Sequence, residues 1–188
     1  MNELILHSVS MVALVSMIVY VVCFICRYRI IPQSLSVTAE YNGRYVWWQI
    51  MICSVMGWLG YWIPNVYTMQ ECGFWPLLAS AGVAGLSLAG YYSYNPGEET
   101  KHDLMVHKIG SFAGAVLVCL FYVVYMKWWA VIGILLLCLA LGLLLPGRRF
   151  DALNSRGYKT SNSIVFWEEI GIVCIVGFDI VKHFIACF

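Results

Sequence analysis

The sequence predicts an all-α fold, a polytopic membrane protein built as a bundle of six transmembrane helices. Of the 188 residues, 62% are hydrophobic and only 11% are charged, whereas a soluble domain is usually about half apolar and about a quarter charged. The apolar residues come in blocks of roughly 18–22, long enough to cross a bilayer core of about 30 Å. We therefore expect residues 1–188 to form a single transmembrane domain.

Six apolar blocks qualify as membrane spans, and each is bounded by polar residues. The first block lies where a secretion signal would lie, but its amino end carries no Lys or Arg and no small-residue cleavage site follows before Arg27. We interpret it as a retained first helix. The spans are residues 9–26, 45–64, 74–92, 104–125, 128–145 and 163–184.

Basic residues are divided unevenly between the two ends of these spans. Only Lys127 and Lys182 fall on one side, while nine of the eleven Lys and Arg fall on the side of the longer connections 27–44, 93–103 and 146–162. Because cytoplasmic loops carry the excess of positive charge, the longer connections are expected in the cytoplasm and both termini outside. The nine are Arg27, Arg29, Arg44, Lys101, Lys108, Arg148, Arg149, Arg156 and Lys159. We expect an integral protein of a bacterial inner membrane.

Small residues at four-residue spacing mark the third and fourth spans. The third contains Ala81, Gly85 and Ala89, and the fourth contains Gly110 and Gly114. In lipid, small residues allow two helix backbones to approach closely. We predict that these two helices pack against each other.

Several polar side chains fall in the cytoplasmic third of their predicted helices, which predicts a cluster in a cavity facing the cytoplasm. An acid at bilayer depth costs on the order of 3 kcal/mol unless it is paired, hydrated or neutralised, so such acids mark binding sites, ion paths or internal pairs. The members are Gln49, Tyr91, His107, Glu168 and Glu169.

Glu168 and Glu169 point about 100° apart around a helix, so they cannot share one environment equally. Glu168 lies on the same stripe as Asp179, eleven residues later, and this geometry favours Glu168 as the inward-facing acid. The alternative for Glu169 is to reach cytoplasmic water and pair with a basic residue of the 146–162 connection.

His107 lies four residues after Asp103 at the start of the fourth span. A His beside a carboxylate is typical of a general base or a metal ligand. The simpler interpretation is an interfacial His, with Asp103 capping the helix. No metal site is predicted, because His102 and His107 would splay about 140° apart on one helix.

A second polar group, on the outer side, contains His7, Asp179, Lys182 and His183. A local pair between Asp179 and a residue three or four positions later is the simplest interpretation. Haem bound by His7 and His183 is a distant alternative, and we predict no cofactor. Cys72 and Cys187 also fall on the outer side, and their spacing leaves open whether they form a disulfide.

The alternating Pro32, Ser34, Ser36 and Thr38, together with "VHKIGSFAG" and "FWEE", resemble segments of small six-helix bacterial membrane proteins of unassigned activity. In layout these are similar to the Frag1/DRAM/Sfk1-like families. The resemblance implies that Ser36, Thr38, His107 and Glu169 occupy positions of interest, which differs from the geometric preference for Glu168.

Three functions remain open. The first-ranked is a non-catalytic structural, sensory or assembly protein whose polar residues hold its helices together. The second is a lipid-modifying enzyme, with His107 as general base oriented by Asp103 or a glutamate. Its substrate would be bound by Ser36, Thr38, Tyr91 and Gln49.

The third hypothesis is a proton-coupled carrier or small channel, with Glu168 and Asp179 as stations along one helix. The expected partners are the lipid bilayer and a lipid or small-molecule ligand, and a homo-oligomer is left open. A net charge of +1 without a basic tract gives no reason to expect nucleic acid.

Overall fold

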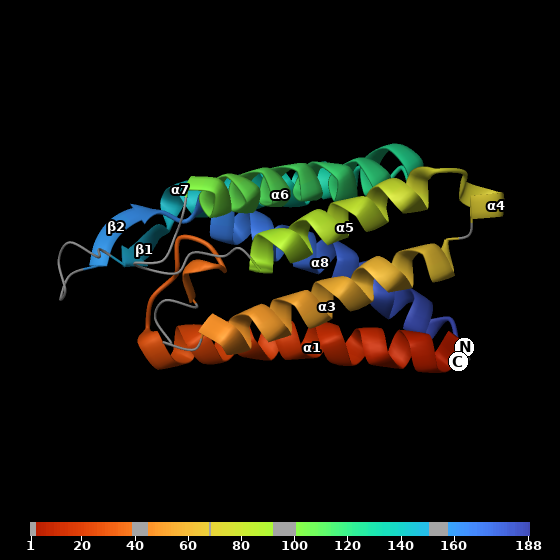
Figure 1. Ribbon diagram of the computed structural model, residues 1–188, viewed down its shortest axis with the longest axis horizontal. Helices are drawn as coiled ribbons and strands as arrows, with labels where there is room; N and C mark the ends of the chain where they lie inside the picture. The colour runs from red at the N-terminus through yellow and green to blue at the C-terminus, as the bar shows by residue number, and fades with distance from the viewer. Residues whose placement is uncertain (1–2, 39–44, 68, 92–100, 151–157) are drawn as a thin grey trace.

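The computed structural model describes residues 3–38, 45–67, 69–91, 101–150 and 158–188 (Figure 1). Each predicted span contains one long helix, and the all-α prediction is confirmed for these residues. The bounds follow the predicted blocks closely, except that the first helix begins six residues earlier. The helices are α1 (Glu3–Tyr28), α3 (Tyr45–Val66), α5 (Trp75–Tyr91), α6 (Lys101–Leu120), α7 (Ala130–Leu144) and α8 (Ile164–Ile185).

Four shorter elements were not predicted. The helix α4 (Met69–Cys72) precedes α5, and a π-helical turn, η1 (Phe121–Tyr125), ends α6. The strands β1 (Pro146–Phe150) and β2 (Tyr158–Asn162) form an antiparallel hairpin in which Pro146 pairs with Asn162. The sequence predicted 146–162 only as a polar connection. Pro146 lacks an N–H group and so cannot continue α7, and five-residue strands are too short to show a clear pattern.

The bundle places both ends of the chain together. Figure 1 shows the start of α1 and the end of α8 at the same end as α4, with the β1–β2 hairpin at the opposite end. In cross-section, α5 packs on α3 and α6, and α8 packs on α1 and α7. The connection 146–162, which contains the hairpin, and the chain ends thus lie at opposite ends of the bundle, and the side of the membrane that each end faces stays a prediction.

The predicted contact between the third and fourth helices is present between α5 and α6. A Cβ atom built on Gly85 would lie 3.2 Å from the carbonyl oxygen of Gly110, and one on Gly82 would lie 2.9 Å from that of Gly114. A larger residue at either position would prevent the two helix backbones from coming this close. Gly82 was not part of the predicted stripe, which used its exposed neighbour Ala81.

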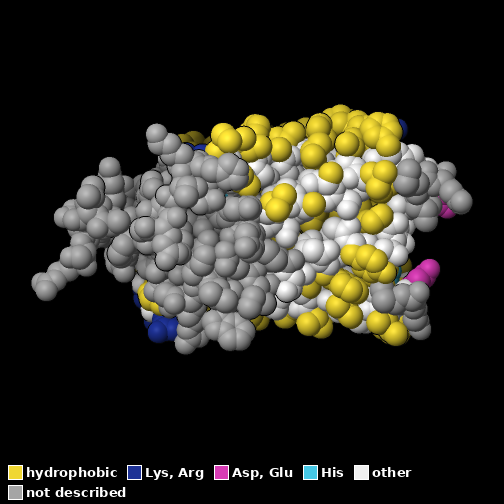
Figure 2. Space-filling model, in the orientation of Figure 1, with side chains coloured by type: hydrophobic (Ala, Val, Ile, Leu, Met, Phe, Trp, Pro, Cys, Tyr) yellow, Lys and Arg dark blue, Asp and Glu magenta, His cyan; other side chains and the backbone are white. Residues whose placement is uncertain are grey.

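Large apolar side chains cover much of the outside of the bundle. Figure 2 shows them over the body of the molecule, whereas the charged side chains visible in this view lie toward its two ends. Among the described residues, two helices, Glu3–Tyr28 and Met105–Tyr125, are long and apolar enough to cross a membrane. Only 22% of the apolar window of each is buried inside the structure, far less than expected for the core helix of a soluble protein.

Two further apolar helices, Trp75–Leu88 and Ala130–Leu144, are shorter. The 22-residue α8 is long enough to span a bilayer core of about 30 Å. It also carries four charged side chains, namely Glu168, Glu169, Asp179 and Lys182. How these charged groups are satisfied therefore matters for the whole architecture.

Candidate functional site

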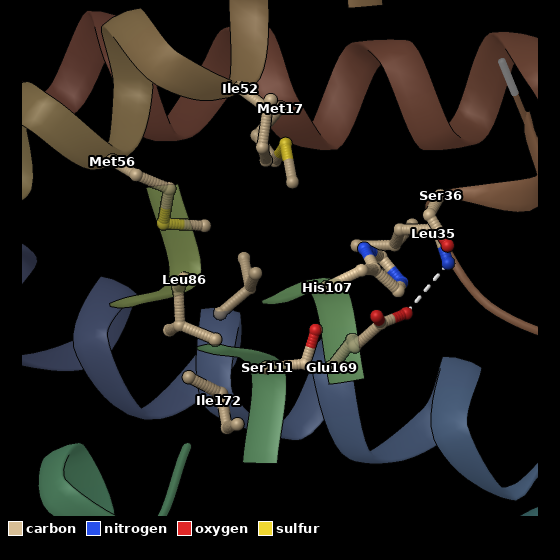
Figure 3. Close-up of a pocket in the computed structure, with 11 residues that line it drawn as sticks. Met17, Leu35, Ser36, Ile52, Met56, Leu86, His107, Ser111, Glu169 and Ile172 are labelled. Atoms are coloured by element: carbon tan, nitrogen blue, oxygen red, sulfur yellow. Dashed lines mark hydrogen bonds between the residues drawn. The ribbon is translucent and has the colours of Figure 1, made fainter. Parts of the chain in front are cut away.

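A cavity of about 60 Å³ lies inside the half of the bundle nearer the hairpin. Its polar residues come from three parts of the chain: Ser36 from the segment after α1, His107 and Ser111 from α6, and Glu169 from α8. The remaining walls are apolar. Figure 3 shows the His107 ring and the Glu169 carboxyl group close to Leu35 and Ser36 at one end of this space. The cavity therefore has one polar end and one apolar end.

The apolar end continues into a second cavity of about 30 Å³ in the middle of the bundle. The two spaces share Met17, Met56, Leu86, Ile172 and Val173 as walls, and every residue that lines the second space is apolar. Together they form a path that changes from polar to apolar along the bundle.

Glu169 is held in place by the segment that follows α1. The backbone N–H of Leu35 donates a hydrogen bond of 2.6 Å to Glu169 Oε2. Nearby, the backbone N–H of Phe166 donates to the carbonyl oxygen of Gln33 at 3.1 Å. These two bonds attach the segment to the first turns of α8, so that Ser36 and Glu169 reach the same cavity.

Thr38 organises this segment rather than lining the cavity. Its hydroxyl group donates to the carbonyl oxygen of Leu35 at 2.6 Å and lies 2.7 Å from the hydroxyl oxygen of Tyr20 on α1. Thr38 is only 1% exposed. Of the two predicted hydroxyl ligands, the structure places Ser36 at the cavity and gives Thr38 a positioning role.

Of the two glutamates, Glu169 shares the cavity with His107, and Glu168 is not among the residues that line it. The cavity follows the α8 stripe of Glu169, Ile172 and Val173, at the three- and four-residue spacing of one helix face. Glu168 lies one turn before Gly171, whose Cα faces Cys138 of α7. The geometric preference for Glu168 is therefore wrong for this cavity, because the Asp179 stripe turns toward other helices.

Three other predicted members cannot be placed at the cavity. Gln49, Tyr91 and Asp103 lie in α3, α5 and α6, but their side chains fall outside the described part of the structure. Ser111 was not among the predicted site residues, although its position four residues after His107 places both on one face of a helix.

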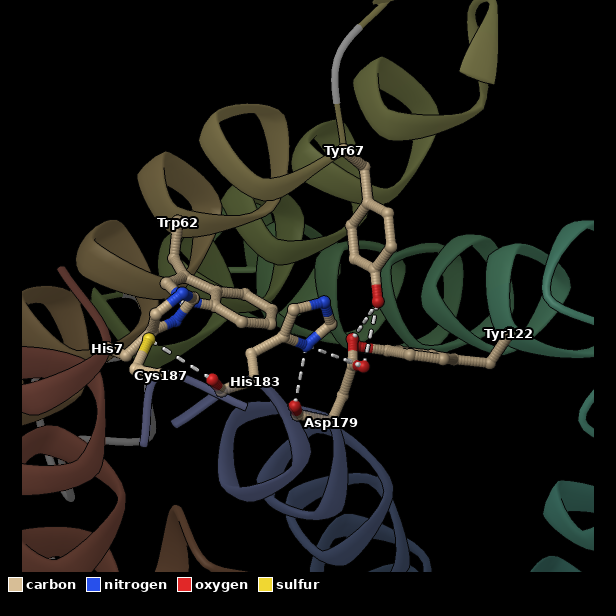
Figure 4. A network of polar contacts seen from close by, with 7 residues as sticks. All are labelled: His7, Trp62, Tyr67, Tyr122, Asp179, His183 and Cys187. Atoms are coloured by element: carbon tan, nitrogen blue, oxygen red, sulfur yellow. Dashed lines mark hydrogen bonds and ion pairs between the residues drawn. The ribbon is translucent and has the colours of Figure 1, made fainter. Parts of the chain in front are cut away.

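A second polar cluster surrounds Asp179, which is fully buried (Figure 4). The Tyr67 hydroxyl group lies 2.8 Å from both carboxyl oxygens, and the Tyr122 hydroxyl group donates to Oδ2 at 3.0 Å. His183 Nδ1 lies 3.4 Å from Oδ1 and 2.9 Å from the Asp179 carbonyl oxygen. The predicted local pair between Asp179 and His183 is present.

Lys182 takes no part in that pair and instead lies over the Trp128 ring, 5.5 Å from its centroid. Tyr67 and Tyr122 were missed because they come from distant parts of the sequence. Burial, reinforced by the neighbouring Asp179, raises the pKa of Tyr67 above its ordinary value. The phenol therefore stays protonated and remains a hydrogen-bond donor.

His7 and His183 pack against the same cluster. Their rings are stacked with centroids 5.7 Å apart, and the Trp62 indole N–H donates to His7 Nδ1 at 3.1 Å. Stacked rings present their faces to each other, whereas axial haem ligands present nitrogen atoms to one iron. This geometry does not support the haem alternative. Within the described residues, no group of three His, Cys, Asp or Glu side chains is arranged to hold a metal ion.

The cysteines considered for a disulfide, Cys72 and Cys187, are both free thiols. Cys72 is buried, while Cys187 is exposed near the end of α8, with its Sγ 3.5 Å from the carbonyl oxygen of His183.

No model of a known protein family matches the chain, and neither a curated protein nor a solved structure matches it. The resemblance to the Frag1/DRAM/Sfk1-like families therefore stays a prediction.

Proposed function

We propose that this protein spans the membrane six times and binds, in its central cavity, an amphipathic molecule with a hydroxyl-bearing or amine-bearing head. The observation that carries the proposal is the composition of the cavity, in which Ser36, His107, Ser111 and Glu169 lie at one end of an otherwise apolar space. The function is that of a lipid-binding, sensory membrane protein.

Six spans are supported by the exposed apolar side chains that cover the outside of the bundle. The helix α7, with 15 residues, is about 22 Å long and would need its apolar flanking residues, such as Trp128, Trp129 and Leu145, to cross a bilayer core of about 30 Å. Two of the three acids of α8 have partners inside the protein, because Glu169 accepts a hydrogen bond from Leu35 and Asp179 from Tyr67 and Tyr122. Internal partners of this kind are what a spanning helix with acids requires.

The side chains at the polar end of the cavity determine which head group the proposed ligand can have. Serine hydroxyl groups, an imidazole and a carboxyl group can together accept from and donate to hydroxyl or amine groups. None of the described residues that line the cavity is Lys or Arg, the usual partners of phosphate. The proposed ligand therefore has an uncharged or cationic head rather than a phosphate.

A second candidate is an enzyme that hydrolyses a lipid ester, because Ser111, His107 and Glu169 border one cavity. A serine, a histidine and an acid are the groups that nucleophilic acyl transfer uses. Release of free fatty acid from 1-hexanoylglycerol by purified protein would favour this candidate, and its absence with retained binding would favour a sensory protein.

Binding of 1-hexanoylglycerol to the detergent-solubilised protein, counted by native mass spectrometry, tests the proposal. We expect one molecule to bind the wild type. His107→Ala and Glu169→Gln should weaken binding by roughly tenfold each, the effect of losing about 1.4 kcal/mol of polar contact. Glu168→Gln is the matched control and should bind as the wild type does. Equal losses for both glutamate variants, or no binding to the wild type, would overturn the proposal.

A further inference from the structure

A separate groove of about 460 Å³ runs along the outside of the bundle between α1 and α8. Its lining is apolar and includes Ile18, Val22, Cys174 and Phe178, all of which are exposed. Along α1 the groove extends from Leu14 to Val22, about 12 Å at the rise of an α-helix. In a six-span protein this face is in contact with lipid tails.

Two residues are shared between the lining of this groove and that of the polar cavity. Met17 and Val173 line the groove on one side and the cavity on the other. Met17 is 1% exposed, and a methionine side chain is unbranched and adapts easily to its surroundings. Because Met17 lines both spaces, displacement of its side chain is the movement that we invoke to connect them.

The sizes of the two spaces suit the two parts of a lipid. A cavity of about 60 Å³ holds roughly four waters, and therefore a small head group but no long acyl chain. The groove is several times larger and wholly apolar. Its direction also fits: α1 runs toward the hairpin end and α8 runs away from it (Figure 1), so the later residues of α1 and the earlier residues of α8 that line the groove, Val22 and Ile170, are the ones nearer the polar residues.

The helices α1 and α8 approach each other closely at one point along the groove. A Cβ atom built on Gly177 would lie 3.0 Å from both terminal methyl carbons of Leu14. A chain in the groove would have its head on the side of Ser36, His107 and Glu169.

We propose that the groove between α1 and α8 is a lateral entry site for a membrane lipid with an uncharged hydroxyl-bearing head, such as a diacylglycerol. Its acyl chain lies in the groove, and displacement of Met17 admits its head to the cavity. This inference rests on the proposed function and adds the source of the ligand, which is the bilayer rather than the aqueous phase.

Photolabelling in nanodiscs tests the entry site. The probe is a diacylglycerol with a diazirine in one acyl chain, present as a minor component of phosphatidylcholine nanodiscs, and mass spectrometry locates the adducts. We expect adducts on the groove residues of α1 and α8, and we expect unlabelled diacylglycerol to compete for them. Phosphatidylglycerol, whose anionic phosphate meets no Lys or Arg among the described residues that line the cavity, should not compete.

Ile18→Trp fills the groove from an exposed position and should lower this labelling by roughly tenfold, since a bulky side chain excludes the ligand by steric conflict. Val19→Trp is the matched control, because Val19 is 51% exposed at the same depth but does not line the groove. It should label as the wild type does. Thermal stability in detergent confirms that both variants fold.

Equal labelling of the two tryptophan variants, or competition by phosphatidylglycerol, would overturn lateral entry. Binding of 1-hexanoylglycerol to the wild type in detergent separates the two ideas. If it binds and groove labelling is not specific, only the entry site is wrong. If it does not bind, the proposed function is wrong and lateral entry falls with it.

Discussion

The backbone N–H of Leu35 donates a 2.6 Å hydrogen bond to Glu169 Oε2, across 134 residues of sequence. This bond joins the segment after α1 to the start of α8 and aims one acid of an adjacent pair at the cavity that His107 lines. It accounts for an acid at this position in an apolar helix, because the carboxyl group has a partner inside the protein.

Replacing Glu169 separates the loss of the hydrogen bond from the loss of the acid. Glu169→Ala leaves the Leu35 N–H without its acceptor and should lower the free energy of unfolding by about 1–3 kcal/mol. Glu169→Gln retains a carbonyl oxygen and should stay close to the wild type in stability. Thermal unfolding in detergent measures both, with Glu168→Ala as the control that is expected to change little. Equal stability of the two Glu169 variants would contradict this role of the bond.

Asp179 should matter more for stability than any other polar residue of α8. Asp179→Ala removes the acceptor of two buried phenols, and each buried donor left unpaired costs about 1–3 kcal/mol. Asp179→Asn keeps one carbonyl oxygen and should lose less. Denaturant unfolding of the two variants shows which of them loses more stability. A smaller loss for Asp179→Ala than for Asp179→Asn would show that the tyrosines find other acceptors.

Two glycine-to-alanine substitutions should change the stability of the protein in opposite directions. A Cβ atom on Gly114 would lie 2.6 Å from the carbonyl oxygen of Gly82, so Gly114→Ala must push α5 and α6 apart, at a cost of about 1–3 kcal/mol. A Cβ atom on Gly57 of α3 meets nothing within 4 Å. Gly57→Ala should therefore stabilise the helix by about 0.5–1 kcal/mol. Thermal unfolding of the pair checks the α5–α6 contact, which would be contradicted if both glycines tolerated alanine.

Alkaline titration tests the environment of Tyr67. Its pKa is raised above the ordinary 10.0, mainly by burial and then by Asp179, so the folded protein keeps this phenol protonated while the unfolded chain loses the proton. Stability from this group is complete below pH 10 and is lost as the pH rises further. Ultraviolet absorbance of phenolate should thus be the same for folded wild type and folded Tyr67→Phe. After denaturation, the variant should show one tyrosine fewer of the twelve in the chain.

The helices could be predicted because their apolar blocks end at local signals. The predicted span 163–184 and the observed α8 differ by one residue at each end, since Ser163 and the polar residues after Asn154 interrupt the apolar run. The α5–α6 contact could also be predicted, because the four-residue spacing of small residues is visible within each helix. Both inferences needed only residues close together in the sequence.

The sites could be predicted only in part, because their geometry depends on distant segments. Helical spacing placed Glu168 with Asp179 but could not show that Leu35 would bond to Glu169 or that Tyr67 and Tyr122 would meet Asp179. Tyr122 lies in a π-helical turn, a local change of helix geometry that no spacing rule anticipates. The choice between Glu168 and Glu169 therefore depended on a contact with a distant segment, which periodicity within α8 does not contain.

Nuclear magnetic resonance of the histidine rings tests the central claim, that Glu169 rather than Glu168 shares a cavity with His107. The chain has four histidines, so ¹⁵N-labelled rings give few signals, and His107→Gln assigns the one that matters. We predict that Glu169→Gln and added 1-hexanoylglycerol each shift the His107 signals and leave those of His7 and His183 in place, while Glu168→Gln leaves His107 unchanged. A His107 signal that responds to Glu168→Gln and not to Glu169→Gln would contradict the account.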